Sequence, residues 1–417
     1  MTVLFVVVVG CFTSWGIAAD LTTPMVAGFK QIFEMSTFQA SLVQLAYFGA
    51  YFLLALPAAF INQRFGYKAG LLAGLALAAA GSFLFFPASK IMTYEAFLIA
   101  LFAIAAGCSI LETSANPYVI SLGPEETATR RLNFAQAFNP VGTIIGVLLA
   151  STLILPKLEA PVDLASASPE QVQEIRAEQL EAVMGPYIGL GLLLVAILIV
   201  IAFQKAPDIV EEFPDTGDTG RGALFRMLWA NKHYRYGVVA QFFNVAAQVC
   251  TWTFIIQYVQ QAISGSLALG GRLLLVSLVV FGISRFVMTW VIGRIRATKV
   301  LAVLGALAVL LCLYAALVPN LSGVIALVAV SVCLSLMFPT IYGVALHGLG
   351  PATKFGAAGL VMAIVGGAIL PLVQGRLLDA TSPAASFVVP AFCFAVVTAY
   401  AIYDLRVERP LEAEVRP

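Results

Sequence analysis

The chain has 417 residues, of which 61% are hydrophobic and only 11% are charged, and its formal net charge is +1. Soluble globular proteins contain about 45–50% apolar and about 25% charged residues, so this composition excludes a water-soluble protein and predicts an all-α protein that crosses a membrane many times. The nearly neutral charge also excludes a strongly basic protein that binds nucleic acid.

Twelve stretches are long and apolar enough to span a bilayer as helices, which takes about 20 residues each. They cover residues 3–28, 38–61, 69–88, 94–121, 132–155, 185–203, 236–262, 272–293, 300–318, 323–346, 355–376 and 384–404. The first stretch lacks the basic start of a signal peptide, so we expect it to remain in the protein as a spanning helix.

Two polar interruptions are longer than the others. In the segment 156–184, Ser168 suits a helix N-cap, which predicts a short surface helix. The segment 204–235 separates six apolar stretches from six. We therefore predict an N-terminal six-helix bundle over 1–203, a linker over 204–235, and a C-terminal six-helix bundle with a short tail over 236–417.

The two halves of the sequence resemble each other at a nearly constant offset. The tripeptide Leu-Gly-Pro occurs at 122–124 and again 227 residues later, and Arg64 and Arg294 lie 230 residues apart. This offset indicates a duplicated six-helix unit; the alternative is coincidence between two sequences of low complexity. Twelve helices in two related bundles around a central cavity are typical of the major facilitator fold.

The Lys and Arg residues are spread unevenly over the predicted loops and tails. Sixteen fall on the side that holds both termini, six fall on the other side, and Arg285 lies inside a predicted helix. Because basic residues favour the cytoplasmic side, we expect a protein of the inner (cell) membrane with both termini in the cytoplasm.

Two acidic residues, Asp20 and Glu112, lie well inside predicted spanning helices. A charge at the centre of a bilayer costs at least about 2.5–3.5 kcal/mol, so such a residue faces a cavity or a partner. Because burial favours the neutral carboxyl, both residues are candidates for gaining and losing a coupled proton. The alternatives are a structural pair with another helix for Glu112 and contact with water near the helix end for Asp20.

Amide side chains recur at helical spacing in two of the predicted helices, and a third helix carries a single amide beside Glu112. Asn116 follows Glu112 by one turn on the same face. The others are Asn133, Gln136 and Asn139 in one helix, and Gln241, Asn244 and Gln248, followed by Trp252, in another. Amides donate and accept hydrogen bonds, which suits sugar hydroxyls, and Trp252 suits the apolar face of a sugar ring. The alternative for each amide is a hydrogen bond between helices.

Other polar residues carry weaker functional signals. Arg285 needs a partner, which is a substrate hydroxyl, an acid or a carbonyl group at a helix end. His347, at a predicted helix end, suits a structural hydrogen bond better than a proton relay. The six cysteines are scattered singly, and no spacing indicates a metal site, a catalytic triad or a nucleotide loop. We therefore expect no enzyme activity, no metal and no cofactor.

Two stretches, LETSANPYVISLGPE at 111–125 and RRLNFAQAFN at 130–139, resemble the fucose:proton symporter family of the major facilitator superfamily. The similarity runs along nearly the whole chain. It implies a proton-coupled sugar importer in which Glu112 binds both a proton and the sugar, and in which Gln136 and Asn139 lie near the sugar.

The first predicted helix departs from the family pattern. The family carries an aspartate at the position of Thr23, and Asp20 takes the position of a family asparagine. The two positions lie about 4.5 Å apart along one helix face, so Asp20 is the candidate to replace the missing carboxyl, with Thr23 beside the substrate. The loop after the second helix also lacks a common aspartate, which leaves Asn62 or Gln63 to make its contacts between the bundles.

These features together predict a monomeric symporter that takes up fucose, another hexose or deoxyhexose, or a related polyol with protons by alternating access. The main alternative is an uncoupled or sodium-coupled sugar facilitator, because Thr23 replaces the family aspartate. An exporter of drugs or metabolites and a receptor or membrane enzyme are further alternatives. The sequence names neither the sugar nor the more stable access state.

Overall fold

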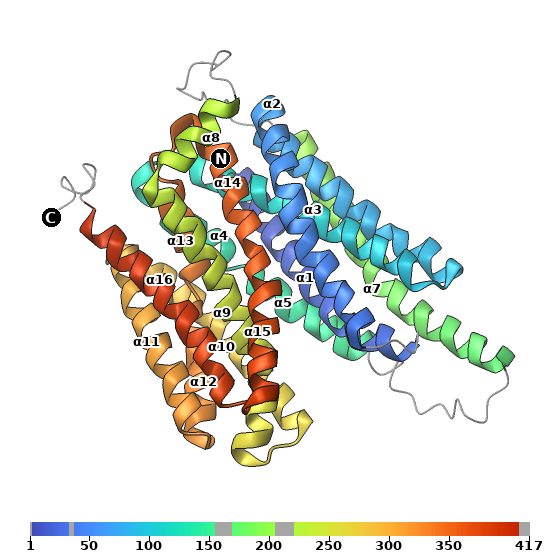
Figure 1. Cartoon of the computed structure of the whole chain (residues 1–417). Helices are drawn as coiled ribbons and strands as arrows, with labels where there is room; N and C mark the ends of the chain where they lie inside the picture. Colours follow the sequence, from blue (N-terminus) through green and yellow to red (C-terminus); the bar gives the residue numbers. More distant parts are fainter. Residues whose placement is uncertain (1, 33–36, 155–168, 205–220, 408–417) are drawn as a thin grey trace. The chain divides into compact units, whose positions relative to one another are not determined.

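The structure is a computed structural model that describes residues 2–32, 37–154, 169–204 and 221–407 (Figure 1). Within these ranges some side chains, including those of 22–32 and 37–45, are outside the description. The described chain is helical between short turns and contains no strand. The prediction of an all-α protein is therefore confirmed.

Two compact units make up the chain. The first consists of Met1–Ala115 and Phe138–Asp208, and the second of Asn116–Ala137 and Ile209–Pro417. The division passes through one helix, between Ala115 and Asn116. The bundle limits predicted from the sequence remain a prediction.

Five α-helices and a π-helical turn carry the first unit; the α-helices are labelled in Figure 1. They are α1 (Thr2–Ile32), α2 (Thr37–Ile91), most of α3 (Tyr94–Ser121), α5 (Asn139–Leu149), η2 (Ala150–Ile154) and α7 (Pro169–Phe203). Helix α2 holds two predicted spans because its backbone leaves the helical conformation at Gly66, where φ is 81° and ψ is 168°, a conformation open to glycine. Helix α7 joins the predicted surface helix to the sixth span, and its predicted N-cap, Ser168, lies outside the described residues.

The second unit begins with the end of α3 and continues with shorter elements and long helices. They are η1 (Glu125–Thr127), α4 (Ala128–Gln136), α8 (Arg221–Ala230), α9 (Lys232–Ile263), α10 (Leu267–Val291), α11 (Ala297–Leu317), α12 (Leu321–Leu334), α13 (Met337–Leu346), η3 (Gly350–Ala352), α14 (Thr353–Met362), η4 (Ala363–Val365), α15 (Gly366–Ala380), η5 (Ala385–Phe387) and α16 (Val388–Arg406). Several predicted spans are thus interrupted helices, such as α12 followed by α13.

Ten helices among the described residues are long and apolar enough to cross a membrane. One of them, Ala46–Ile91, includes the Gly66 break and so holds two predicted spans. A shorter apolar helix, Phe5–Leu21, matches the first predicted span. The described residues thereby account for all twelve predicted spans.

Glycines allow close packing between helices of the first unit. Gly142 and Gly146 form a GxxxG pattern on α5, and a Cβ at either position would meet backbone atoms of α1 at Thr13 or Ile17. A Cβ on Gly107 of α3 would likewise meet the backbone of α2. Small residues stabilise helix pairs in lipid because they let backbones approach. These contacts hold α1 against α5 and α2 against α3.

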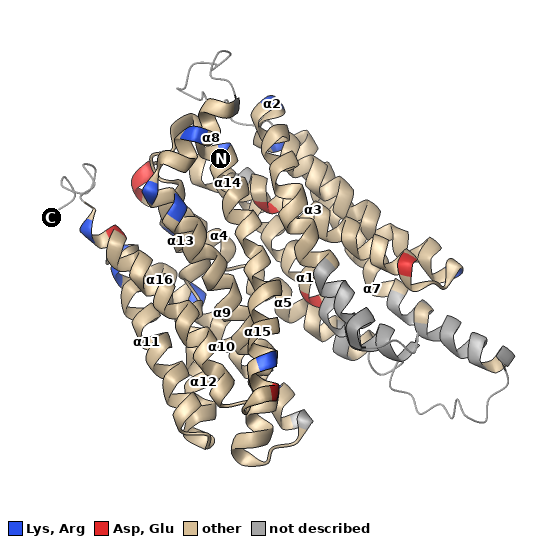
Figure 2. Cartoon of the chain, viewed as in Figure 1, with Lys and Arg blue, Asp and Glu red and all other residues tan. Residues whose placement is uncertain are grey.

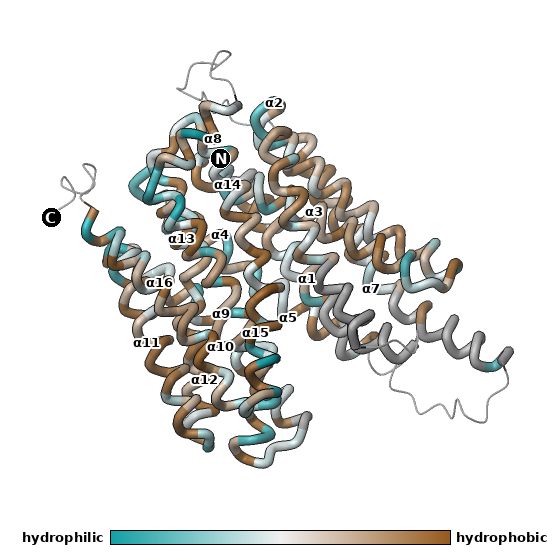
Figure 3. The backbone as a smooth tube through the Cα atoms, in the orientation of Figure 1, coloured by the Kyte–Doolittle hydropathy of each residue, from teal (hydrophilic) through white to brown (hydrophobic). Residues whose placement is uncertain are grey.

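Apolar surface dominates the outside of the second unit, as α11 illustrates. Val303, Leu310 and Leu317 are 66%, 65% and 81% exposed, whereas Leu301 and Ala308 on the other side are fully buried. Figure 3 shows long hydrophobic stretches along these helices, and Figure 2 shows charged residues of this unit mainly toward helix ends. Such a helix suits a lipid environment, in which both faces are apolar.

Candidate functional site

Glu112 is a carboxyl buried within the first unit. It lies on α3 and is 2% exposed. The same part of α3 is tied to α2, since Thr113 supplies a carbonyl to the Asn62 amide at 3.3 Å and Ser114 donates to the Asn62 oxygen at 2.9 Å. Asn62, which was expected to make contacts between bundles, thus joins two helices inside the first unit.

Asp20, the second acid, lies on α1 and is half-buried. A side-chain hydrogen bond joins it to Thr143 on α5. The GxxxG contact between α1 and α5 brings Thr143 to this position, because it lies next to Gly142 in the sequence. Thr23, the residue at the family's aspartate position, has its backbone in α1, but its side chain lies outside the described residues.

Three aromatic side chains of the first unit form a hydrogen-bonded group. The Trp15 indole nitrogen donates to the Tyr51 hydroxyl at 2.5 Å, and the hydroxyls of Tyr51 and Tyr47 lie 3.3 Å apart. The two tyrosines are not among the residues predicted from the sequence. Their spacing of four residues on an otherwise apolar helix is the signal that identifies them.

The amide stripe predicted over 132–155 is divided between two helices. A turn at Ala137 and Phe138 separates α4 from α5, so Gln136 ends α4 and Asn139 begins α5. The span predicted over 132–155 is nevertheless present, as Glu125–Ile154. In the first unit, the Asn139 amide donates to the Phe12 carbonyl of α1 at 3.3 Å, which is a bond between helices.

A buried polar cluster in the second unit collects several predicted residues. The Gln136 amide donates to Asn116 at 2.8 Å, and the Gln136 carbonyl accepts from Arg285 at 2.6 Å. The Asn133 amide donates to the Thr129 carbonyl at 2.9 Å and lies 3.3 Å from the Thr340 hydroxyl. For Arg285, the sequence had left three kinds of partner open, and the structure provides a carbonyl at a helix end.

Helix α9 carries the other amide stripe. Gln241 and Asn244 are 0% and 1% exposed, and neither end of either amide has a hydrogen-bond partner among the described residues. An unpaired buried amide costs about 1–3 kcal/mol, so these two groups lower the stability of the second unit. Gln248, one turn further, is half-buried.

Trp252 follows on the same helix and is half-buried. Its indole nitrogen donates to the Ser331 hydroxyl at 3.2 Å, and Phe281 packs edge-on against it with ring centroids 5.0 Å apart. The same Phe281 ring also contacts Arg285, whose guanidinium carbon lies 4.8 Å from the ring centroid. Phe281, which is not among the residues predicted from the sequence, thereby connects Trp252 to the polar cluster.

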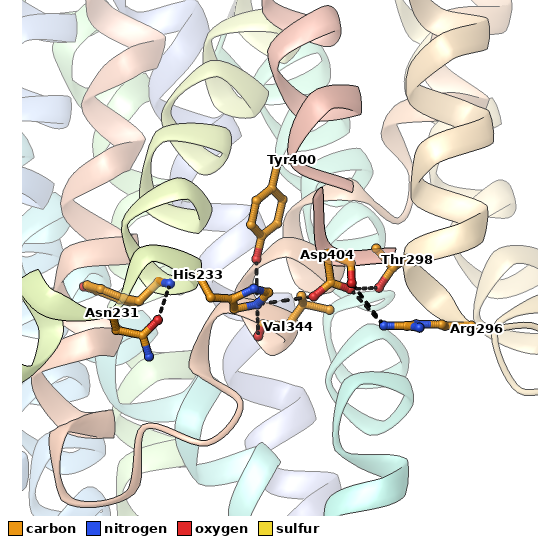
Figure 4. Close-up of polar contacts among 8 residues, drawn as sticks. Asn231, His233, Arg296, Thr298, Val344, Tyr400 and Asp404 are labelled. Atoms are coloured by element: carbon orange, nitrogen blue, oxygen red, sulfur yellow. Dashed lines mark hydrogen bonds and ion pairs between the residues drawn. The ribbon is translucent and has the colours of Figure 1, made fainter. Parts of the chain in front are cut away.

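A third charged cluster lies at one end of the second unit (Figure 4). The fully buried Asp404 accepts a hydrogen bond from Thr298 at 2.7 Å and lies 3.4 Å from both Arg296 and His233. His233 also contacts the Tyr400 hydroxyl at 3.3 Å. This cluster joins the start of α9, the start of α11 and the end of α16, which indicates a structural role.

Helix ends elsewhere are capped in a related way. In the first unit, the Lys68 ammonium donates to the carbonyls of Ala202 and Gln204 at 2.9 and 2.7 Å, at the end of α7. His347, expected to be structural, lies 3.2 Å from the Glu125 carboxylate.

Among the described residues, no group of three or more His, Cys, Asp or Glu side chains is placed to hold a metal.

Comparison with known proteins gives the family. The model of the Major Facilitator Superfamily matches residues 4–365. This chain belongs to the major facilitator superfamily. Its members are transporters rather than enzymes, and the predicted fold, with twelve spanning helices in two six-helix bundles, is that of this superfamily.

Two curated relatives and one solved structure illustrate the similarity. The L-fucose-proton symporter of Haemophilus influenzae is 40% identical over 409 residues, covering 95% of each chain. A glucose/galactose transporter of Brucella abortus is 34% identical over 393 residues, covering 94% of this chain and 91% of the relative. The crystal structure of the major facilitator FucP in the outward conformation is 35% identical, with a TM-score of 0.90 over 97% of this chain and 99% of that one.

Proposed function

We propose that this major facilitator takes up a sugar together with protons by alternating access. The observation that carries the proposal is Glu112, a carboxyl that is 2% exposed inside a helix long enough to span the membrane. The similarity to an L-fucose-proton symporter over 95% of the chain supports the proton as the coupled ion.

The physical reason is the difference between the two charge states of the carboxyl. A charged group inside a bilayer costs at least about 2.5–3.5 kcal/mol, whereas the protonated group is neutral and inexpensive to bury. A carrier that changes its access with Glu112 protonated, and with sugar bound, avoids this cost. Asp20, which is partly exposed and bonded to Thr143, is the second proton-exchanging group in this proposal.

Sugar recognition falls to the amides. Gln241 and Asn244 provide buried donors and acceptors for hydroxyl groups. Trp252, further along α9, provides an aromatic ring for the apolar face of the sugar. Asn116, Asn133, Gln136, Asn139, Gln248, Thr23 and Arg285 complete the proposed substrate set. The sugar class is a hexose, a deoxyhexose such as L-fucose, or a related polyol, because the relatives include an L-fucose symporter and a glucose/galactose transporter.

The test is transport by purified protein in liposomes that contain a pH-sensitive dye. L-fucose, D-galactose and D-glucose are added outside one at a time, and we expect the sugar that is transported to acidify the lumen. Glu112→Gln should abolish acidification and retain exchange of the same sugar across the membrane. The matched control is Glu95→Gln, which changes an exposed carboxylate at the start of the same helix.

The outcome also separates the alternatives. Acidification by Glu112→Gln equal to that of the unaltered protein would contradict the proposed role of this residue. Exchange without acidification in the unaltered protein would indicate an uncoupled carrier, and uptake that requires sodium would indicate a sodium-coupled one. Thr23 at the family's aspartate position motivates both alternatives.

We further propose a monomer in the inner membrane with both termini in the cytoplasm and bundles over 1–203 and 236–417. The six native cysteines are buried, so single cysteines introduced at exposed positions report sidedness. With a membrane-impermeant maleimide on cells, Lys90→Cys should react and Lys232→Cys should not. The reverse pattern would overturn the orientation.

A further inference from the structure

The start of α9 carries basic and aromatic side chains on its outer face. The helix begins after its N-cap, Asn231, whose side chain caps the first turn. Lys232, Arg235 and Tyr236 follow at helical spacing; Lys232 and Tyr236 are exposed, and Arg235 is half-buried. Because the helix Lys232–Ile263 is long and apolar enough to span a membrane, its first turn lies at the boundary of the bilayer, where basic and aromatic residues are typical.

Arg235 is held against an exposed tryptophan of α8. Its guanidinium carbon lies 5.8 Å from the Trp229 ring centroid. Trp229 is 74% exposed, whereas Leu224 and Leu228 on another face of α8 are buried and hold this helix on the second unit. A guanidinium has five N–H donors, and no hydrogen bond or ion pair joins that of Arg235 to a residue that the structure describes. The ring thus positions a cation whose donors the described residues leave available.

The surroundings of this face are basic. Helices α8, α13, α14 and α16 pack against this end of α9. Together with α9 they contain a single acid, Asp404, which is fully buried and already bound to Thr298 and Arg296. Arg406, which ends α16, is exposed and adds a further positive charge. Among the described residues, the exposed charges at this end of α9 therefore complement an anion.

An apolar path leads from the basic residues along α9 and α16. Tyr236 packs edge-on against Tyr403 of α16, with ring centroids 4.9 Å apart. Two turns further along α9, Phe243 packs against the exposed Phe392 of α16, with ring centroids 5.6 Å apart. Val239 lies between the two ring pairs on the same face of α9 and is also exposed. Such a path suits an acyl chain, and a free anion has no use for it.

We propose that this face binds one anionic phospholipid of the membrane. Its phosphate accepts hydrogen bonds from Arg235 and Lys232, Trp229 and Tyr236 flank the headgroup, and an acyl chain lies along Val239 and the ring pair beyond it. Anionic lipids are concentrated in the cytoplasmic leaflet, which agrees with the orientation proposed above. The site is separate from the sugar and from the coupled proton.

The experiment is native mass spectrometry of the full chain in detergent, titrated with phosphatidylglycerol or with phosphatidylcholine of the same acyl chains. We expect tighter binding of phosphatidylglycerol. Arg235→Gln and Lys232→Gln should each weaken it by roughly fivefold, the contribution of one basic residue at an anionic surface, and should leave phosphatidylcholine binding unaltered. The matched control is Lys299→Gln, which removes an exposed lysine from the first turn of α11 and should bind phosphatidylglycerol normally.

Three outcomes would overturn the proposal. Equal binding of the two lipids would exclude recognition of the negative headgroup. A loss in Lys299→Gln as large as that in Arg235→Gln would indicate diffuse surface charge rather than a site. Displacement of phosphatidylglycerol by millimolar inorganic phosphate would indicate a site for a free anion. Sugar exchange in liposomes shows that each variant is folded.

A second measurement locates the lipid. In vesicles that contain dibrominated phosphatidylglycerol, bromine quenches the fluorescence of nearby tryptophans, and the part of the quenching that is lost in Trp229→Phe reports on Trp229. We expect this part to exceed that obtained with dibrominated phosphatidylcholine and to fall in Arg235→Gln. Equal quenching of Trp229 by the two brominated lipids would contradict the proposed site.

Discussion

Arg285 offers a quantitative test of how the second unit holds its amides. Its guanidinium donates to the Gln136 carbonyl at 2.6 Å, it is 6% exposed, and it lies 4.8 Å from the Phe281 ring centroid. Since Gln136 in turn bonds to Asn116, removal of the guanidinium frees the end of α4 and both amides. We therefore expect Arg285→Met to lose stability and sugar affinity.

The magnitude follows from the two contacts that are lost. A hydrogen bond from a charged donor contributes about 1.5–3 kcal/mol, and a buried cation–π contact contributes about 0.5–2 kcal/mol. A combined loss of about 2–5 kcal/mol corresponds to roughly 30-fold or more in the folding equilibrium or in the sugar dissociation constant. Phe281→Leu removes only the ring and should produce a smaller loss.

The assay combines urea unfolding in detergent with sugar binding measured by calorimetry. Arg272→Met is the matched control, because it removes an exposed arginine from the same helix. If Arg285→Met unfolds and binds sugar as Arg272→Met does, Arg285 does not position α4 and the reasoning is refuted.

Three further predictions concern other parts of the chain. Asp404→Asn leaves Arg296 and its histidine neighbour without a buried counter-charge, so we expect a lower unfolding temperature and a loss of up to about 3–5 kcal/mol, reduced by their partial exposure; an unchanged unfolding curve would contradict this. Gly142→Leu should prevent stable folding, judged by size-exclusion chromatography, while Gly189→Leu, with open space around its Cβ, should not. Gln241→Met should raise the unfolding temperature, since it removes an unpaired buried amide, and weaken sugar binding at least about tenfold; a variant that binds sugar normally would exclude Gln241 from the substrate set.

Part of the candidate site was predictable because single residues stand out against an apolar background. Glu112 and Asp20 are carboxyls within apolar stretches, and Gln241 and Asn244 share a helix face. Each of these observations needs only composition and the helical period. The structure agrees that Glu112, Gln241 and Asn244 are buried.

Other parts of the site depend on contacts that no local pattern contains. The stripe that ends in Gln136 and Asn139 is divided by a turn at Ala137, although its spacing fits one continuous helix. Arg285 donates to a carbonyl 149 positions away in sequence. The expectation that a buried arginine needs a partner would have been met equally well by a carbonyl at any other helix end. Tyr47 and Tyr51 are recognised as part of a hydrogen-bonded group only because Trp15, on another helix, donates to the Tyr51 hydroxyl.

The amino-acid sequence by itself determined that this protein is a membrane-spanning helical transporter with two buried acids, because the bilayer demands long apolar helices and penalises every charge within them. The tertiary structure alone decided which polar groups meet. Hydrogen bonds between helices depend on the rotation and depth of each helix, and close glycine contacts such as those of α1 with α5 set these quantities. A helical period gives the face on which a side chain lies, and only packing gives the group that it contacts.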